Sequence, residues 1–300
     1  MPKTDISVVV TVFNEAETII ALLDSLAEQT LKPKSIWITD AGSTDETVRQ
    51  IEVWKAGHSK QPLEVIMMPG ANRSRGRNLA IEQVKTSIVA VTDAGCTAKP
   101  DWLENLALAF GEPGIRSVAG FYRMKATNDW QKIFQYFLGT VPGKFDPNTY
   151  LPSSRSIAFT KEAWGKAGKY PENFDTCEDL VFAAKLKRCS GMAVAQNAIV
   201  NWTMPPTLGQ FRRQVSSYAQ GDIIAGYWPH ILKILTVWLR YVLFWWWPSL
   251  FIIYVLYSEY KFREKANWRY IPIVQVTADL AVMIGSFQGL GRLIKRGLSG

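Results

Sequence analysis

Residues 88–100 read IVAVTDAGCTAKP, and this stretch decides the fold predicted for the chain. Ile88–Thr92 is an apolar run dominated by β-branched residues, which is typical of a strand buried on both faces of a parallel sheet. Asp93 follows the run directly, and Gly95 then breaks the chain. Open α/β folds bind ligands at the rim where such strands end, so Asp93 is a candidate ligand-binding carboxylate. The alternative is a capped turn, because Asp-x-Gly is ordinary turn chemistry.

Three earlier strands, each followed by a helical pattern, precede this stretch. We expect them at Ser7–Phe13, Ser35–Thr39 and Leu63–Met68. Four strand–helix alternations within about 90 residues predict an α/β fold with a mostly parallel sheet and right-handed crossovers.

Two capping boxes predict where the first two helices begin. Asn14 with Glu17, and Ser43 with Glu46, have the spacing in which each side chain bonds the other residue's backbone N–H. Later in the chain, Ser117–Arg123 is expected to be an edge strand.

A strand is also expected at Ser156–Phe159, and Glu178–Asp179 opens a further helix. Its predicted inner face is Leu180, Val181, Ala184 and Leu186. Adjacent acids are favoured at a helix N-terminus by the macrodipole, so the acidic pair also has a purely structural interpretation.

Charged residues gather at the predicted rim of the sheet. Asp40 ends the second strand as Asp93 ends the fourth, and the loop with Arg73, Arg75 and Arg77 precedes the third helix. Two carboxylates and three guanidiniums around one crevice suit a sugar and ribose held beside phosphates. A solvated loop is the alternative for the arginines.

Composition narrows the class of protein. At 300 residues the chain accommodates one large domain, or one domain with a tail. The three cysteines, Cys96, Cys177 and Cys189, are too widely spaced for a zinc signature, and their odd number argues against a disulfide framework, so we expect a reducing compartment. With two histidines, the chain has little scope for histidine triads or histidine metal clusters.

The net charge of +8 is concentrated near the C-terminus. Residues 206–300 hold 11 Lys and Arg against 4 Asp and Glu, and this is also the most apolar and aromatic part. A basic and apolar segment favours an anionic membrane surface over nucleic acid, which calls for a polar basic face.

The order of the motifs resembles the family 2 glycosyltransferases of the GT-A fold. Between residues 6 and 226 the resemblance is carried by VVVTVFNEAETI, ITDAGSTDET, NRSRGRNLAI, TDAGC and CEDLVFAAKLKR. The segments PSSRSIAF and FRRQVSSYAQGD are similar to bacterial and archaeal members with hydrophobic C-terminal tails.

The resemblance implies a nucleotide-sugar donor, with UDP expected, and a role for each matching residue. Asp179, with Glu178 beside it, would be the base that takes the proton of the acceptor hydroxyl in an inverting transfer. Asp40 would contact the nucleotide base, and Asp93 would lie by ribose, diphosphate and metal. The implied donor-binding residues are Thr11, Phe13, Asn14, Glu15, Asp40, Gly42, Ser43, Arg73, Arg75, Arg77, Asn78, Asp93, Ala94, Gly95, Arg155, Arg212 and Arg213.

One departure from the family's pattern concerns the metal. The third position of the Asp-x-Asp motif is Gly95, and neither it nor Cys96 supplies the oxygen ligand that Mg²⁺ or Mn²⁺ prefers. We expect a divalent cation held weakly, by Asp93 and the diphosphate. Arginines are expected to neutralise more of the phosphate charge than is usual.

The last third of the chain predicts a membrane-associated tail. Gln210–Gly226 reads as a polar helix near the active site, or as a plain interface helix. In Tyr227–Arg240 the two cations Lys233 and Arg240 share one helix face, which is typical of a helix lying on a bilayer.

Two segments are candidate spans. Residues 241–258 carry no charge over 18 residues, with Pro248 as a kink, and residues 271–290 hold a single carboxylate, Asp279. At least one span is expected, with a re-entrant or monotopic anchor as the alternative.

The sequence therefore predicts a GT-A catalytic domain over residues 1–226 and a helical membrane tail over residues 227–300. The predicted activity is inverting transfer of a sugar to a lipid or lipid-linked glycan, at the cytoplasmic face of the cell membrane. The alternatives are a sugar nucleotidyltransferase, which calls for a glycine-rich basic loop after the first strand, and a non-catalytic membrane scaffold that kept the fold.

Overall fold

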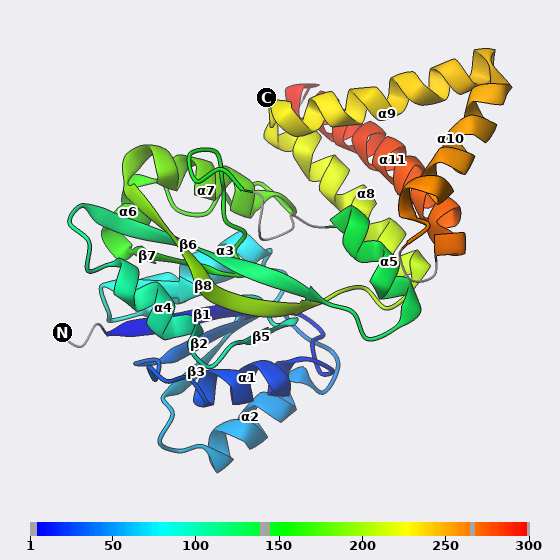
Figure 1. The fold of residues 1–300 in the computed structure, drawn as a ribbon. Coiled ribbons are helices and arrows are strands. Elements are labelled where there is room, and N and C mark those ends of the chain that lie inside the picture. The colour runs from blue at the N-terminus through cyan, green and yellow to red at the C-terminus, as the bar shows by residue number, and fades with distance from the viewer. Residues whose placement is uncertain (1–4, 139–144, 265–267, 299–300) are drawn as a thin grey trace. The chain divides into compact units, whose positions relative to one another are not determined.

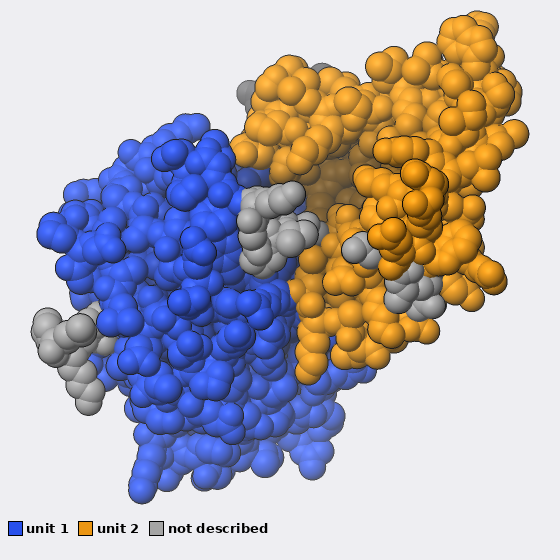
Figure 2. Space-filling model, in the orientation of Figure 1, with its two compact units in different colours: residues 1–123, 141–203 blue, residues 124–140, 204–300 orange. Residues whose placement is uncertain are grey.

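The structure is a computed structural model that describes residues 5–138, 145–264 and 268–298 (Figure 1). The chain forms two compact units (Figure 2). The first comprises Met1–Arg123 and Val141–Thr203, and the second Met124–Thr140 and Met204–Gly300. The expected functional boundary at residue 226 stays a prediction, since these units are defined by packing alone and divide the chain elsewhere.

The first unit is a mixed sheet with helices on both faces. Its strands are β1 (Ile6–Val12), β2 (Ile36–Asp40), β3 (Leu63–Met67), β4 (Ile88–Val91), β5 (Cys96–Ala98), β6 (Ile115–Lys125), β7 (Ile157–Thr160) and β8 (Gly191–Thr203). Its helices are α1 (Ile19–Ala27), α2 (Thr47–Gly57), α3 (Arg73–Gln83), α4 (Trp102–Ala109), α6 (Lys161–Lys166) and α7 (Glu178–Cys189).

The sheet order is β3-β2-β1-β4-β7-β6-β8-β5. β1 pairs in parallel with β2 and β4, and β2 with β3, as the four alternations predicted. β7 then pairs antiparallel with β4 and β6, and β5 antiparallel with β8. The predicted α/β class is confirmed. The strand expected at 117–123 is present within β6, but β6 lies between β7 and β8, so its predicted place at the edge is wrong.

The parallel strands are covered on both faces. Val9 of β1 and Val89 of β4 pack with Ile81 of α3 and with Trp164 and Phe182, which come from α6 and α7. The neighbouring Val8 and Val10 are also fully buried, and α1 and α2 lie on the opposite side of the sheet (Figure 1). Covered faces of this kind explain the apolar runs in β1 and β4.

The inner face of α7 differs from the prediction. Its buried apolar residues are Phe182, Ala183 and Leu186, whereas the expected Leu180, Val181 and Ala184 are only half-buried. The aromatic ring of Phe182 packs against Tyr170, with ring centroids 3.9 Å apart, and both rings lie in the core with residues of the sheet. The side of α7 that carries Phe182 therefore faces the sheet.

The two predicted capping boxes are wrong. α1 begins at Ile19 and α2 at Thr47, and neither helix has a side-chain cap on its N-cap residue. Asn14 instead accepts a hydrogen bond from the Thr44 N–H (2.8 Å), and the Ser43 hydroxyl accepts one from the Asn14 N–H (2.9 Å). The capping residues therefore bond across two loops.

The second unit is helical and consists of α5 (Asp129–Leu138), α8 (Leu208–Ala225), α9 (Trp228–Trp246), α10 (Pro248–Phe262), the short 3₁₀ helix η1 (Trp268–Tyr270) and α11 (Ile271–Leu298). The candidate span 241–258 is not one helix, because α9 ends at Trp246 and α10 starts at Pro248, whose missing N–H prevents continuation. By length and composition, residues 268–295 are the one segment of the described chain suited to cross a membrane.

α11 packs closely on α8 within this unit. A methyl group at Gly285 would collide with the Ser216 carbonyl, and one at Gly289 would lie 2.8 Å from the Gln220 carbonyl oxygen. Small residues four positions apart thus let the two backbones approach each other.

Candidate active site

Two loops form the carboxyl-terminal rim above β1 and β2. Asn14 adopts a left-handed conformation (φ 54°), and it is held there by its two bonds to the loop after β2. The Glu15 N–H donates to the Thr47 hydroxyl (2.7 Å). Phe13 directly precedes these fixed residues and is 57% exposed, so the rim presents an aromatic ring to solvent.

Asp40 organises the second loop rather than facing outward. One of its oxygens accepts from the N–H groups of Gly42 (2.8 Å) and Ser43 (2.9 Å). Gly42 has φ 96°, a region that residues with a side chain rarely adopt. The other oxygen, Oδ2, is buried and has no hydrogen-bond partner among the described residues, so one acceptor of Asp40 is left over.

Gly76 lets the start of α3 approach the sheet. A Cβ at this position would lie 2.9 Å from the Thr11 side chain and 3.4 Å from that of Thr39. Asn72 caps the helix by accepting from the Arg75 N–H, and its amide donates to the Glu172 carbonyl (2.7 Å). The arginine loop is therefore fixed between the strand ends and the segment that leads into α7.

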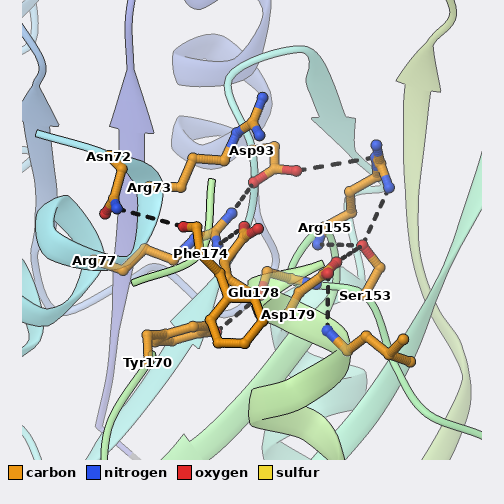
Figure 3. Close-up of polar contacts among 12 residues, drawn as sticks. Asn72, Arg73, Arg77, Asp93, Ser153, Arg155, Tyr170, Phe174, Glu178 and Asp179 are labelled. Carbon is orange, nitrogen blue, oxygen red and sulfur yellow. Dashed lines mark hydrogen bonds and ion pairs between the residues drawn. The ribbon is translucent and has the colours of Figure 1, made fainter. Parts of the chain in front are cut away.

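Arg77 lies at the centre of this arrangement (Figure 3). Its guanidinium is 1% exposed and donates to Asp93 Oδ1 (2.8 Å) and to Glu178 Oε1 (2.7 Å). Tyr170 lies beneath it, with the ring centroid 5.2 Å away. Arg77 thus joins Asp93, just after β4, to Glu178 at the start of α7, 85 residues later in the chain.

The pKa values of the two carboxylates in this bridge shift in opposite directions. Burial raises the pKa of Asp93, but the guanidiniums of Arg77, Arg155 and Arg73 outweigh it and hold that pKa below the ordinary value of 3.8. Burial also raises the pKa of Glu178, and there it outweighs Arg77, so the pKa stays above 4.5. Asp93 is the firmly ionised partner.

Asp179 occupies a different environment from its neighbour Glu178. It is half-buried, and its Oδ2 accepts from the Ser153 hydroxyl (2.9 Å) and the Ser154 N–H (3.4 Å). The side chain of Glu178 is 4% exposed and held by Arg77. Of the adjacent acids, Asp179 is therefore the more accessible one.

Arg155 completes the group around Asp93. Its Nε lies 3.9 Å from Asp93 Oδ2, and its guanidinium stacks on the rings of Trp202 (4.1 Å) and Tyr122 (5.0 Å). Ser153 connects it to Asp179, because the Arg155 Nη1 donates to the Ser153 hydroxyl (3.1 Å). Asp93, Arg155, Ser153 and Asp179 form one continuous chain of contacts (Figure 3).

The donor set around Asp93 does not fit a protein-held divalent cation. Both Asp93 oxygens face guanidiniums, and no cluster of three ligating side chains occurs in the described part of the chain. Glu178 is engaged by Arg77. Burial raises the pKa of Cys96 to about 12, which disfavours the thiolate form that ligates a metal.

The structure does not bring every candidate residue to the rim. Arg77 is enclosed as described, and Ala94 is 2% exposed. Asn78 is buried, and its side-chain amide is hydrogen-bonded to Tyr170, Glu172 and Trp164. These placements argue against direct contact of those side chains with a donor. The side chains of Arg73 and Arg75 are exposed beside the rim, and Arg212 and Arg213 are exposed on α8 of the second unit.

Four residues of the site were not predicted. Ser153 lies in the quoted segment PSSRSIAF, next to Arg155, so its position was a usable signal. Tyr122, Tyr170 and Trp202 carried none, because an aromatic residue in a strand or loop ordinarily belongs to a core.

Comparison with known proteins agrees with this fold. The profile of the family described as Glycosyl transferase family 2 matches residues 7–167. Glycosyltransferase AglE of Haloferax volcanii is 28% identical over 157 residues, 51% of this chain and 48% of the relative. O-antigen chain rhamnosyltransferase RfbN of Salmonella typhimurium is 23% identical over 197 residues, 60% of each chain.

Among solved structures, S. aureus TarS 1–349 in complex with UDP has a TM-score of 0.54 at 21% identity, covering 72% of this chain and 64% of that one. Mannosyltransferase PcManGT from Pyrobaculum calidifontis, in complex with GDP-Man and Mn²⁺, has a TM-score of 0.58 at 16% identity, covering 98% and 75%.

The fold and the charged rim define a GT-A domain. The chain belongs to glycosyl transferase family 2, which confirms the family predicted from the motifs. It spans about half to three fifths of the length of the two relatives found by sequence.

Proposed function

We propose that the protein is an inverting glycosyltransferase that moves a sugar from a nucleoside-diphosphate sugar to a hydroxyl group. The observation that carries this proposal is the chain of contacts from Asp93 through Arg155 and Ser153 to Asp179. It puts a carboxylate that can act as a base on the same rim as cationic groups that suit a diphosphate.

In the proposed reaction Asp179 takes the proton of the acceptor hydroxyl, whose oxygen bonds to the anomeric carbon of the donor sugar. The bond from that carbon to the phosphate oxygen breaks, and the electron pair leaves with the diphosphate. Ser153 orients Asp179, and the guanidinium at Arg155 stabilises the charge that develops on the leaving group. Asp93 holds Arg155 in position.

For the donor, the named relatives and structural neighbours support a nucleotide sugar without selecting one. TarS is described with UDP and UDP-GlcNAc, and PcManGT with GDP-Man. We propose that the rim with Phe13 and Asn14 receives the nucleotide, and that the fully buried Asp40 shapes this rim through its bonds to the Gly42 and Ser43 N–H groups instead of contacting the base.

We propose that the acceptor is a lipid or a lipid-linked glycan, reached from the cytoplasmic side. The support is the outer surface of α9, on which Trp228, Leu232, Leu235, Leu239 and Val242 are exposed at helical spacing. So much contiguous exposed apolar surface is unusual for a protein that stays in water.

The turn between α9 and α10 extends this apolar surface. Trp245, Trp246 and Trp247 are 84%, 70% and 57% exposed, and tryptophan favours the lipid–water interface. We therefore propose membrane attachment through α9 and α10.

Liposome flotation tests this attachment. Replacing the three tryptophans by serine should lower the bound fraction at least tenfold, while Trp54→Phe in the first unit should leave it unchanged. Resistance of the wild-type protein to carbonate extraction would point to a span by residues 268–295 instead.

The transfer is tested by nucleotide release from a panel of UDP- and GDP-sugars, with a membrane-lipid extract as acceptor. Asp179→Asn should lower release by about 10²–10⁴-fold, the usual contribution of a general base. Glu162→Gln, on the exposed face of α6, is the matched control. Nucleotide binding without release from any donor, or release that Asp179→Asn does not change, would favour a non-catalytic scaffold or a different base.

A further inference from the structure

The site raises the question of what neutralises a bound diphosphate. A divalent cation would have to share Asp93, whose two oxygens already face Arg77 (2.8 Å) and Arg155 (3.9 Å). Of the two carboxylates that Arg77 bridges, only Asp93 is partly exposed, with 28% of its side chain accessible against 4% for Glu178. A divalent cation at Asp93 would share that one carboxylate with two guanidiniums and would be repelled by both of them.

Arg155, by contrast, is built into the site as a fixed cation. Its side chain is 15% exposed and is held on four sides by Asp93, Ser153, Trp202 and Tyr122. A stacked guanidinium loses little freedom when it binds a further anion, and its planar fork matches phosphate oxygens. Fixed charges of this kind need no reorganisation as a leaving group develops charge.

Gly95 and Arg155 are neighbours through the same ring. A Cβ at Gly95 would lie 3.9 Å from Trp202 Cδ1, and Trp202 stacks on the guanidinium. Gly95, which lacks the carboxylate of the motif's third position, thus lies close to the guanidinium of Arg155.

We propose that Arg155, fixed by Asp93 and stacked on Trp202, replaces a divalent cation in this protein and binds the diphosphate directly. The inference rests on the proposed function for its substrate. The transfer then runs without metal: the electron pair of the broken sugar–phosphate bond goes to a phosphate oxygen that Arg155 contacts, and the proton goes to Asp179.

The first test measures binding, which does not require turnover. Isothermal titration calorimetry with UDP and with GDP, in EDTA and in Mn²⁺, should give dissociation constants within threefold of each other. Arg155→Gln should weaken binding at least tenfold in both buffers, whereas Arg49→Gln, an exposed arginine on α2, should not. An affinity that rises tenfold or more with Mn²⁺, or that Arg155→Gln leaves unchanged, overturns the inference, as does absence of binding.

The second test replaces the positive charge of Arg155 by that of a Mn²⁺ ion held by a new carboxylate at position 95. Gly95 has an ordinary backbone conformation and room for a side chain, so Gly95→Asp is expected to fold. In the Arg155→Gln background, Gly95→Asp should restore nucleotide binding in Mn²⁺ but not in EDTA. Electron paramagnetic resonance spectra should then show Mn²⁺ bound in the complex of protein, nucleotide and metal. Gly95→Asn in the same background should restore neither, and restoration by it would contradict a metal role for the new carboxylate.

Turnover separates this inference from the proposed function. Nucleotide-sugar cleavage that survives EDTA and falls by about 10²–10³-fold in Arg155→Gln supports both. Cleavage abolished by EDTA and restored by Mn²⁺ overturns the inference and leaves the transferase intact. Metal-free nucleotide binding that depends on Arg155, without cleavage of any donor, supports the inference and removes the transferase.

Discussion

Replacing Arg77 by methionine tests whether its guanidinium holds the site together from inside. The substitution keeps a long side chain but leaves Glu178, 4% exposed, and Asp93 without their shared partner. Breaking a buried ion pair by removing one partner costs about 3–5 kcal/mol. At about 2–4 °C per kcal/mol for a domain of this size, the melting temperature at pH 7.5 should fall by about 6–20 °C.

The sign of the pH dependence identifies the cause of that loss. Glu178 already has a pKa above 4.5, and without Arg77 burial raises it further. A carboxyl group with a raised folded-state pKa destabilises the fold only where it must be ionised, so the loss should grow as the pH rises above 4.5. Arg77→Met should therefore lie closer to wild type at pH 5 than at pH 7.5.

Differential scanning calorimetry at both pH values, with Arg77→Met/Glu178→Gln beside the single variant, is the assay. Removing the stranded charge should recover about half of the lost stability at pH 7.5. A drop below 2 °C, or a loss of equal size at both pH values, would refute the view that Arg77 is a buried bridge. It would restore Arg77 as a candidate donor ligand.

Three further substitutions have expected outcomes. Asp93→Asn should lower the free energy of unfolding by about 1.5–3 kcal/mol at neutral pH. The pKa of Asp93 lies below 3.8, so in denaturant titrations performed below that pH the difference from wild type should shrink and then disappear. Gly120→Ala would push a methyl group into a buried serine hydroxyl and should cost about 1–3 kcal/mol in urea unfolding, whereas Gly165→Ala, with open space around it, should cost nothing. Arg240→Leu should destabilise the helical unit by about 1.5–3 kcal/mol because Asp279 loses its 2.7 Å partner, and replacing both by leucine should recover most of that loss in thermal melts.

The strand ends were predictable because their signal is local. The apolar runs of β1 and β4 need both faces covered, and Asp93 follows its run directly. The helix starts were not, because Asn14 has the side chain of a cap but bonds to Thr44, which is 30 residues away. Capping rules weigh neighbouring residues, and here two loops offered a better partner.

The tail shows the same limit from another direction. Charge and hydropathy marked residues 241–258 as one span, while Pro248 divides the segment between two helices. The long strand β8 was missed because residues 191–203 mix polar and apolar side chains without alternation. Its pairing with β5 stabilises it instead, and that pairing is not visible in either segment alone.

The roles of the basic residues required the structure most of all. Arg73, Arg77 and Arg155 carry the same side chain, and the family resemblance implies donor binding for all three alike. Burial separates them: a guanidinium that is 1% exposed between two carboxylates serves the fold, and one that is 15% exposed on an aromatic ring can still accept an anion. Since Asp93 joins the two, a change at either arginine is felt at the other through one carboxylate. A double-mutant cycle of Arg77→Met and Arg155→Gln on nucleotide affinity should therefore be non-additive, and strict additivity would mean that the buried bridge and the rim act independently.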